Sequence, residues 1–342
     1  MNLATETDDA APAAPAPAPA LAGVAPESVL QAARSGPLYV VLNAGAGSED
    51  ADEREATLAR VFGAAGRRHH CFAIGPSERV ADVAEHAVRA AQARGGVVVA
   101  AGGDGTISAV AHAVLGSGCP FGVLPQGTFN YFAREHGIPQ DTQGAAEALL
   151  HASVEPVQAG LVNDRTFLVN ASLGLYPKLL EDRETWKAQL GRNRAVAMLA
   201  ALRTLLRERR QLQLTIESRH GARTLRTPTL FVGNNRLQLD RVGLSEADAL
   251  ERGRLAAIVL RPISNVAMFG LALRGALGQL GDADHVSSFD FRRIAVHVRG
   301  LSRVKVAMDG EVEWMTTPLT FAVAPEPLWL LMPPPDRRAE VK

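Results

Sequence analysis

The sequence predicts an α/β N-terminal domain with a doubly wound parallel sheet, followed by a mainly antiparallel β-sandwich C-terminal domain with inserted helices. Three observations predict this fold. Short apolar strands alternate with helical stretches from residue 38 to residue 124. Three of these strands end in turns rich in glycine or polar residues. Beyond Val157 the alternation gives way to short strands separated by turn signals, with helical stretches at 176–190 and 194–209.

The stretch Val97–Thr106, which reads VVVAAGGDGT, organises the first half of the chain. Its apolar run predicts a buried strand, and the apolar residues after Thr106 recur at helical spacing. The three glycines let the backbone approach a ligand closely, and the free amides at a helix start attract phosphate. Asp104 beside phosphates indicates Mg²⁺. A glycine turn with an Asp cap also occurs without a ligand, but GGDGT directly after an apolar strand favours phosphate binding.

Two further turns follow predicted strands of the same sheet. The strand at 38–42 ends at Asn43, and the strand at 121–124 ends in Pro125-Gln126-Gly127-Thr128-Phe129-Asn130. In a parallel sheet the ligand lies beyond the carboxyl ends of the strands. The turns at Asn43, Gly102 and Gly127 therefore predict one nucleotide site.

The domain organisation follows from the same patterns. Residues 1–35 are expected to be a disordered tail rich in Ala and Pro, without the basic and apolar regions of a signal peptide. Residues 36–157 are expected to form the nucleotide-binding domain, with the segment 325–335 able to pack back on it. Residues 158–324 are expected to form the β-rich domain.

Composition excludes several classes of protein. The 342 residues are 47% hydrophobic and carry a formal net charge of zero, which argues against a general nucleic-acid binder. No apolar run reaches the roughly 18 residues that a transmembrane helix needs. The two cysteines, Cys71 and Cys119, form no paired framework, as expected in a reducing cytoplasm.

Taken together, these motifs resemble the diacylglycerol kinase catalytic-domain family, which also contains sphingosine and ceramide kinases. The resemblance covers nearly all of Leu38–Pro335. Its motifs are Gly102-Gly103-Asp104-Gly105-Thr106, Pro125-x-Gly127-Thr128-x-Asn130, Phe167–Gly174 and Asp309-Gly310-Glu311. Asn43–Ser48 lies where the family has an Asn-Pro turn, with Ala44 in place of the proline. GGDGT alone is shared with NAD kinases, whereas GGDGT, PxGTxN and DGE in this order and spacing are more specific.

The resemblance implies ATP-dependent transfer of the γ-phosphate to a hydroxyl of diacylglycerol or a related lipid. It implies that Asp309 accepts the proton of the lipid hydroxyl and that Asp104 and Glu311 hold Mg²⁺. The nucleotide-binding residues that it implies are Asn43, Gly102, Gly103, Asp104, Gly105, Thr106, Gly127, Thr128, Asn130 and Glu311. It makes residues 158–324 the lipid-substrate domain of a cytoplasmic enzyme that meets its lipid at the membrane surface. Whether the enzyme forms a homodimer is an open alternative at this point.

Three details remain open at this stage. Asp-Gly at 309–310 also predicts an ordinary hairpin turn. The apolar residues Met268, Phe269 and Leu273 are either a packing helix or a lip that docks on a membrane. Some bacterial members of the family hold a structural Mg²⁺ with an Asp-Gly-x-Leu-Asp element, but here the last position is Ala256, so that site is not expected.

Two other functions remain as alternatives. The first is a kinase of a soluble acceptor such as NAD, but an NAD kinase usually carries an Asn-Glu pair soon after GGDGT. Here the segment after Pro125 and Gln126 reads GTFNYFAR, which favours the lipid kinases. The second is a non-catalytic nucleotide-binding regulatory module, which would be expected to lack Asp104 or Asp309.

Overall fold

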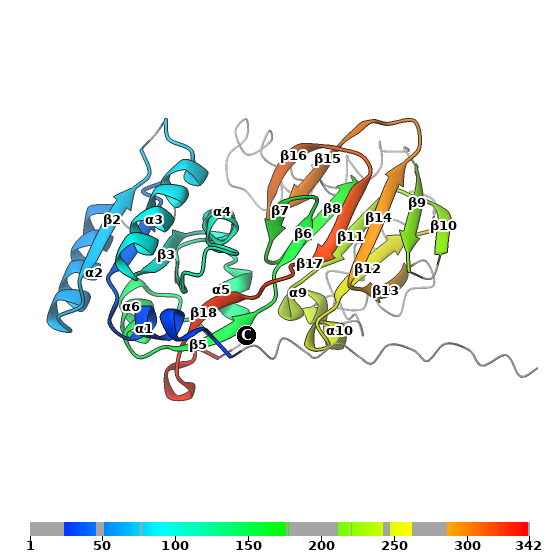
Figure 1. Cartoon of the computed structure of the whole chain (residues 1–342). Helices are drawn as coiled ribbons and strands as arrows, with labels where there is room; N and C mark the ends of the chain where they lie inside the picture. The colour runs from blue at the N-terminus through cyan, green and yellow to red at the C-terminus, as the bar shows by residue number, and fades with distance from the viewer. Residues whose placement is uncertain are drawn as a thin grey trace, which may run out of the picture.

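The structure is a computed structural model that describes residues 24–45, 51–75, 77–175, 177, 211–219, 221–241, 247–261 and 286–340. These residues form three six-stranded sheets. The first sheet is built from residues 38–157 and a returning strand at 328–332, and forms with its helices what we call the N-terminal half of the molecule. The other two sheets are built from residues 160–323 and form the C-terminal half. Figure 1 shows the two halves side by side, joined near the strands β5 (Ser153–Val157) and β18 (Leu328–Met332).

The first sheet has the strand order β2-β1-β3-β4-β18-β5. All of its pairings are parallel except that between β18 and the edge strand β5. Every residue of β1, β3 and β4 is buried, because helices cover both faces of a doubly wound sheet. The remaining strands are β1 (Leu38–Leu42), β2 (His69–Ala73), β3 (Val97–Gly102) and β4 (Phe121–Pro125).

The helices of this half pack in pairs on the sheet. Helix α2 contacts α6, and α3 contacts α4. The chain runs from β1 outward to β2, then back past β1 to β3 and on to β4, so right-handed crossovers place α2 on one face of the sheet and α3 and α4 on the other. No described helix is long and apolar enough to cross a membrane. The helices are α2 (Ala51–Ala64), α3 (Val80–Arg94), α4 (Asp104–Val114), α5 (Tyr131–Glu135) and α6 (Thr142–Leu150).

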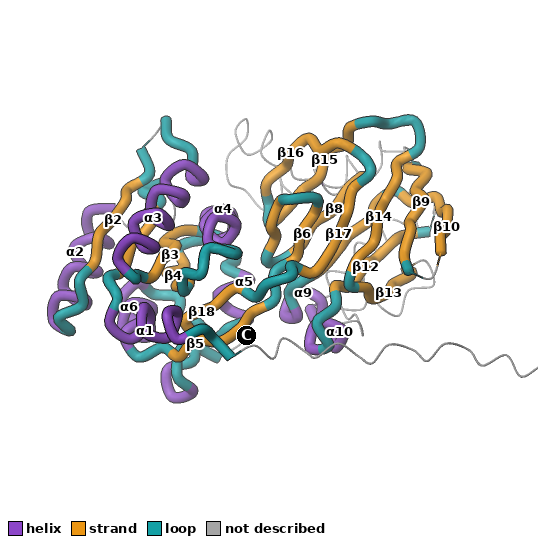
Figure 2. The backbone as a smooth tube through the Cα atoms, viewed as in Figure 1, coloured by secondary structure: helices purple, strands orange, loops and turns teal. Residues whose placement is uncertain are grey.

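The C-terminal half is a sandwich of two antiparallel sheets (Figure 2). One sheet has the order β10-β9-β14-β17-β6-β7, and the other has the order β13-β12-β11-β8-β15-β16. Apolar side chains from both sheets form one core. The strands are β6 (Gly160–Val162), β7 (Arg165–Phe167), β8 (Asn170–Gly174), β9 (Leu212–Ser218), β10 (Gly221–Thr227), β11 (Thr229–Gly233), β12 (Leu255–Leu260), β13 (Val286–Phe291), β14 (Arg293–Val298), β15 (Arg303–Met308), β16 (Glu311–Thr316) and β17 (Leu319–Val323).

The predicted fold class is confirmed, including helices inserted between strands. Helices α9 (Arg236–Arg241) and α10 (Ala247–Glu251) lie between β11 and β12 in the chain. The expected helices at 176–190 and 194–209 lie almost entirely outside the described residues, and the apolar region around Met268 lies outside them too.

The expected disordered tail ends earlier than residue 35. Residues Glu27–Ser35 form helix α1, which buries Val29 and Ala32 and contacts β5. Arg67 stabilises the end of this helix, because its guanidinium donates to the carbonyl oxygen of Ala33 at 2.7 Å. The prediction missed α1 because a nine-residue helix has little stability alone and depends on such tertiary contacts. At the other end of the chain, Pro335–Arg337 forms a short 3-10 helix.

Candidate active site

The three predicted turns follow three adjacent strands, β1, β3 and β4, at the carboxyl edge of the first sheet. Backbone hydrogen bonds hold them together: Asn43 N donates to Ala101 O at 2.9 Å, and Gln126 N donates to Gly102 O at 2.8 Å. The side chain of Asn43 also donates to Thr106 Oγ1 at 2.8 Å. The first and second turns are therefore fixed relative to each other by backbone and side-chain contacts.

The two glycine loops touch at Gly103 and Gly127. A Cβ atom on Gly127 would lie 2.8 Å from the Cα atom of Gly103 and 2.6 Å from Oδ1 of Asn130. A Cβ atom on Gly102 would likewise meet the side chain of Thr106 at 2.6 Å. Any larger side chain at Gly127 would thus push the loops apart. Gly103 and Gly127 thus allow the two loops to pack backbone against backbone, whereas Gly102 leaves room for the side chain of Thr106.

Asn130 shapes the second loop from within. Its Oδ1 accepts from Gly127 N at 2.8 Å, and its Nδ2 donates to Gly127 O and to Gln140 Oε1. Its backbone takes the left-handed conformation, with φ of 49°. The amide of Asn130 is therefore occupied in holding the turn, while Thr128 beside it is exposed. A cavity of about 380 Å³ opens here and is lined by Gly127, Thr128, Phe129, Asn130, Arg134, Gln140, Ala339 and Glu340.

Asp104 begins α4 and faces the start of α5. The backbone N–H groups of Asn130, Tyr131 and Phe132 hydrogen-bond to its carboxylate. Its Oδ1 is nevertheless buried and has no hydrogen-bond partner among the described residues. Burial, and then the charge of Asp309, raise the pKa of Asp104 to about 6 against the pull of those amides. A cation near Oδ1 would remove the penalty that the unpaired oxygen carries.

Asp309 and Gly310 form the two-residue turn of the hairpin between β15 and β16. Met308 pairs with Glu311 across the turn, and both central residues have positive φ, 46° and 95°. This is the pattern of a type I′ turn. Asp309 is thus the hairpin residue that the local sequence indicates, and its side chain also points to the other half of the molecule.

The carboxylate of Asp309 accepts four hydrogen bonds. Oδ2 accepts from Ser108 Oγ at 2.6 Å and from Leu168 N at 2.7 Å. Oδ1 accepts from Val169 N and Asn170 N, each at 2.9 Å. The residue is 8% exposed, and burial raises the pKa of its carboxyl while the four donors oppose that shift. A carboxylate has about four lone-pair positions, so these donors fill them.

Glu311, on the same hairpin, makes a second contact with the GGDGT loop, at Gly105. Its Oε1 lies 2.9 Å from the position that a Cβ atom on Gly105 would take. The carboxyl of Asp104 also feels the charge of Asp309. The hairpin thus places Asp309 and Glu311 beside the start of α4, although they lie about 200 residues away in the chain.

The unpaired Oδ1 of Asp104 and the nearby carboxylate of Glu311 fit a magnesium ion. Within the described ranges, no group of three His, Cys, Asp or Glu side chains is arranged to hold a metal. Magnesium commonly keeps several waters and takes one or two carboxylates together with substrate phosphates. Two carboxylates beside the glycine loops would therefore suit Mg²⁺ bound together with the phosphates of a nucleotide.

Two residues of this region, Arg54 and Ser108, were not predicted from the sequence to belong to the site. Arg54 in α2 is 1% exposed. Its guanidinium donates to Gln126 Oε1 at 2.6 Å and to Ala44 O at 3.1 Å, so it links the first turn to the third. The signal was its spacing, because Arg54, Leu58 and Val61 share one buried helix face. Ser108 gave no comparable signal, because its partner Asp309 lies 201 residues away.

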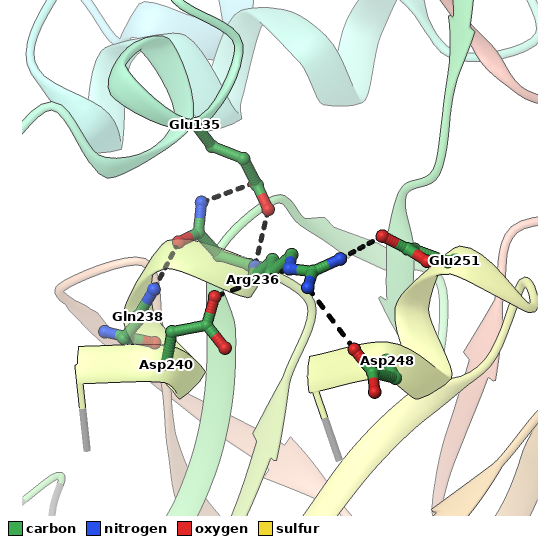
Figure 3. Close-up of polar contacts among 7 residues, drawn as sticks. Glu135, Arg236, Gln238, Asp240, Asp248 and Glu251 are labelled. Atoms are coloured by element: carbon green, nitrogen blue, oxygen red, sulfur yellow. Dashed lines mark hydrogen bonds and ion pairs between the residues drawn. The ribbon is translucent and has the colours of Figure 1, made fainter. Parts of the chain in front are cut away.

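A second polar cluster joins α5 to α9 and α10 (Figure 3). Glu135 accepts from Asn235 Nδ2 at 2.6 Å and from the backbone N–H of Arg236. The guanidinium of Arg236 pairs with Asp240 at 3.4 Å, with Asp248 at 3.3 Å and with Glu251. Burial raises the pKa of Glu135 to about 7. Because α5 follows the second glycine loop directly, this cluster connects that loop to the C-terminal half.

This cluster does not fit a structural magnesium ion. Asp240 and Glu251, the acidic residues near the altered element, already pair with the guanidinium of Arg236. Ala256 is fully buried in β12 and supplies no oxygen from its side chain. Arg236 therefore supplies the positive charge among these carboxylates.

The sequence of this region matches a known family. Residues 37–162 match the sequence profile of the diacylglycerol kinase catalytic domain. This part of the chain is therefore similar to the diacylglycerol kinase catalytic domain. The resemblance expected from the motifs is thereby confirmed.

Curated relatives of the diacylglycerol kinase domain align with this chain over short regions. A protein of Klebsiella pneumoniae named "Probable lipid kinase YegS-like" is 41% identical over 98 residues, which are 28% of this chain and 33% of that protein. A protein of Staphylococcus aureus named "Diacylglycerol kinase" is 34% identical over 100 residues, 29% of this chain and 32% of that protein. An uncharacterized protein of Synechocystis is 32% identical over 139 residues, 40% of this chain and 31% of that protein. The chain thus spans about a third of the length of these relatives.

Solved structures extend the likeness to both halves. A diacylglycerol kinase of Bacillus anthracis superposes with a TM-score of 0.65, covering 87% of this chain and 97% of that chain at 18% identity. At this identity the match establishes a shared fold. The mixed α/β sheet and the antiparallel sandwich are thus shared with the fold of that kinase.

Proposed function

We propose that this protein is an ATP-dependent lipid kinase that transfers the γ-phosphate of ATP to a lipid hydroxyl. The observation that carries the proposal is the docking of the Asp309 hairpin on the helix that follows GGDGT. Phosphoryl transfer depends mostly on positioning and on neutralising charge. A nucleotide loop and a distant acidic turn held in contact provide both.

In this proposal the three turns bind the nucleotide. The backbone amides of the loops at 43–45, 102–106 and 127–130 receive the phosphates, and close contact between Gly103 and Gly127 keeps both loops in one place. Arg54 supports the loops by fixing Ala44 and Gln126. Asn130 acts indirectly, since its side chain is bonded to Gly127.

Asp104 and Glu311 would hold Mg²⁺ in this site. When bound, the ion would neutralise charge on the phosphates and orient the transferred group. The orphan Oδ1 of Asp104 supports this role. Asp309 would be the final acceptor of the proton from the lipid hydroxyl, as a carboxylate buried at the junction of the two halves.

The lipid would be reached at a membrane surface. The outer end of the Asp309 hairpin carries Trp314, which is 57% exposed. Lys305 and Arg303 lie over its ring at 5.4 Å and 6.0 Å. An exposed tryptophan beside cationic side chains suits the interface of an anionic bilayer. Because this surface and the acidic turn share one hairpin, docking there would bring the lipid headgroup toward the site.

The experiment that tests the function is a panel of acceptors with γ-labelled ATP and Mg²⁺. The panel contains diacylglycerol, ceramide, a sphingoid base and phosphatidylglycerol in detergent micelles, with NAD as the soluble acceptor. We expect label in one or more of the lipids. Label in NAD alone would assign a soluble acceptor, and binding of ATP with no label in any acceptor would assign a regulatory module.

A further inference from the structure

The four hydrogen bonds to Asp309 limit how it can accept a proton. Three of the donors are backbone N–H groups of Leu168, Val169 and Asn170, which cannot release their protons under ordinary conditions. The fourth donor is the hydroxyl of Ser108 at 2.6 Å. A lipid hydroxyl approaching Asp309 finds the lone pairs already used.

The hydroxyl of Ser108 differs from the other three donors in its chemistry. A serine hydroxyl donates one hydrogen bond and accepts two, so it can receive a proton while giving up its own. The 2.6 Å distance to Oδ2 is the usual length of a hydrogen bond from a hydroxyl to a charged carboxylate, and is shorter than a bond between neutral oxygens. Among the described contacts of Asp309, this is the one through which a proton can pass.

The position of Ser108 suits such a role. It lies in α4, four residues after Asp104, and therefore on the same side of the helix one turn further on. Both Ser108 and Asp309 are 8% exposed, so bulk water is largely kept from their hydrogen bond. The hydroxyl of Ser108 therefore connects the helical turn that begins at Asp104 with the carboxylate of Asp309.

We propose that Ser108 is the proton relay between the lipid hydroxyl and Asp309, an inference that rests on the proposed kinase function. The lipid oxygen attacks the γ-phosphorus while its proton moves to Ser108 Oγ, and the proton of Ser108 moves to Asp309 Oδ2. The bond from the γ-phosphorus to the bridging oxygen breaks, and its electron pair leaves with ADP. After product release, Asp309 returns its proton to solvent through the same hydroxyl.

The test compares Ser108→Ala with Ser172→Ala. Ser172 is fully buried in β8, and its Oγ has no hydrogen-bond partner among the described residues, so it is a matched control. Transfer of label from ATP to diacylglycerol, or to the panel lipid labelled fastest, is measured in a single turnover. Ser108→Ala is expected to slow transfer by about 10²-fold or more, with the Kd for ATP close to wild type and the melting temperature lowered by no more than about 8 °C for the one hydrogen bond lost. Ser172→Ala is expected to transfer at the wild-type rate.

A second readout does not depend on whether Ser108→Ala folds. The rate of wild-type transfer is measured in mixtures of H₂O and D₂O. Two protons moving together give a curved dependence on the deuterium fraction, and one proton gives a straight line. Ser108→Thr keeps the hydroxyl and is expected to keep the curve.

Three outcomes would overturn the relay: transfer by Ser108→Ala at a rate near that of Ser172→Ala, a straight line for the wild type, or parallel losses of transfer, ATP binding and melting temperature in Ser108→Ala. The last outcome would make Ser108 a structural clamp between the halves. Failure of the wild type to label any lipid would instead show that the proposed function is wrong, before any variant is compared.

Discussion

Asp309→Asn is a sharp test of the buried acidic turn, because the structure predicts that it changes stability as well as activity. An asparagine offers one acceptor oxygen and an NH₂ group where the aspartate offers two oxygens. With the amide oxygen facing Val169 N and Asn170 N, the NH₂ group faces Ser108 and Leu168. The hydroxyl of Ser108 can rotate to accept, but the N–H of Leu168 loses its partner.

The expected loss of stability follows from that single N–H. A buried donor left without a partner costs about 1–3 kcal/mol. Loss of the charge weakens the remaining hydrogen bonds, but it also removes the cost of burying a charged carboxylate, the same cost that raises the pKa of Asp309. These two contributions to stability oppose each other. We therefore expect a loss of about 2 kcal/mol, which is about 4–8 °C in the melting temperature of a domain of this size.

Calorimetric melting and turnover measured on the same preparations provide the assay. Turnover is expected to fall by at least about 10²-fold. Asp336→Asn, a change at an exposed position in the C-terminal 3-10 helix, is the control and should stay within about 0.5 kcal/mol of wild type. A melting temperature of Asp309→Asn within about 1 °C of wild type would refute the four-donor arrangement.

Four further predictions follow from other contacts. Gly127→Ala should raise the Kd for ATP at least about tenfold by calorimetry, because its Cβ would meet Gly103, whereas Gly63→Ala, with open space around it, should not. Burial raises the pKa of Glu135 to about 7, so this residue contributes stability below pH 4.5 that is lost as pH rises through 7. The free energy of unfolding, measured in urea, should therefore fall by up to about 3 kcal/mol more in wild type than in Glu135→Gln over that pH range. Trp314→Ala should weaken binding to anionic vesicles about tenfold in flotation, and equal flotation of both proteins would exclude this surface. In the absence of nucleotide, chelation of divalent ions should leave the wild-type melting temperature unchanged, because Arg236 supplies the positive charge among Asp240, Asp248 and Glu251.

The edge of the parallel sheet could be predicted because its information is local. Each turn follows its own strand in the chain, and the geometry of parallel strands brings Asn43, Gly102 and Gly127 together. The hairpin at Asp309 could also be predicted from neighbouring residues, since Asp-Gly is a strong turn signal. Its role beside α4 came from the resemblance.

The partners of these residues could not be predicted, because they depend on contacts between distant parts of the chain. Ser108 meets Asp309 across 201 residues, and Glu135 meets Asn235 across 100. Neither pairing leaves a pattern in hydrophobic spacing. Helix α1 was missed for a similar reason, since its stability comes from β5 and Arg67.

The central claim is that phosphoryl transfer to a lipid takes place where GGDGT meets the Asp309 hairpin. The most direct measurement is transfer of label from γ-labelled ATP into the lipid fraction by wild type and by Asp104→Asn at saturating Mg²⁺, with the Kd for metal-free ATP measured alongside. We expect the wild type to label lipid and Asp104→Asn to lose at least about 10²-fold in rate while keeping metal-free ATP affinity. Equal rates for the two proteins, or label confined to the aqueous fraction, would contradict the account.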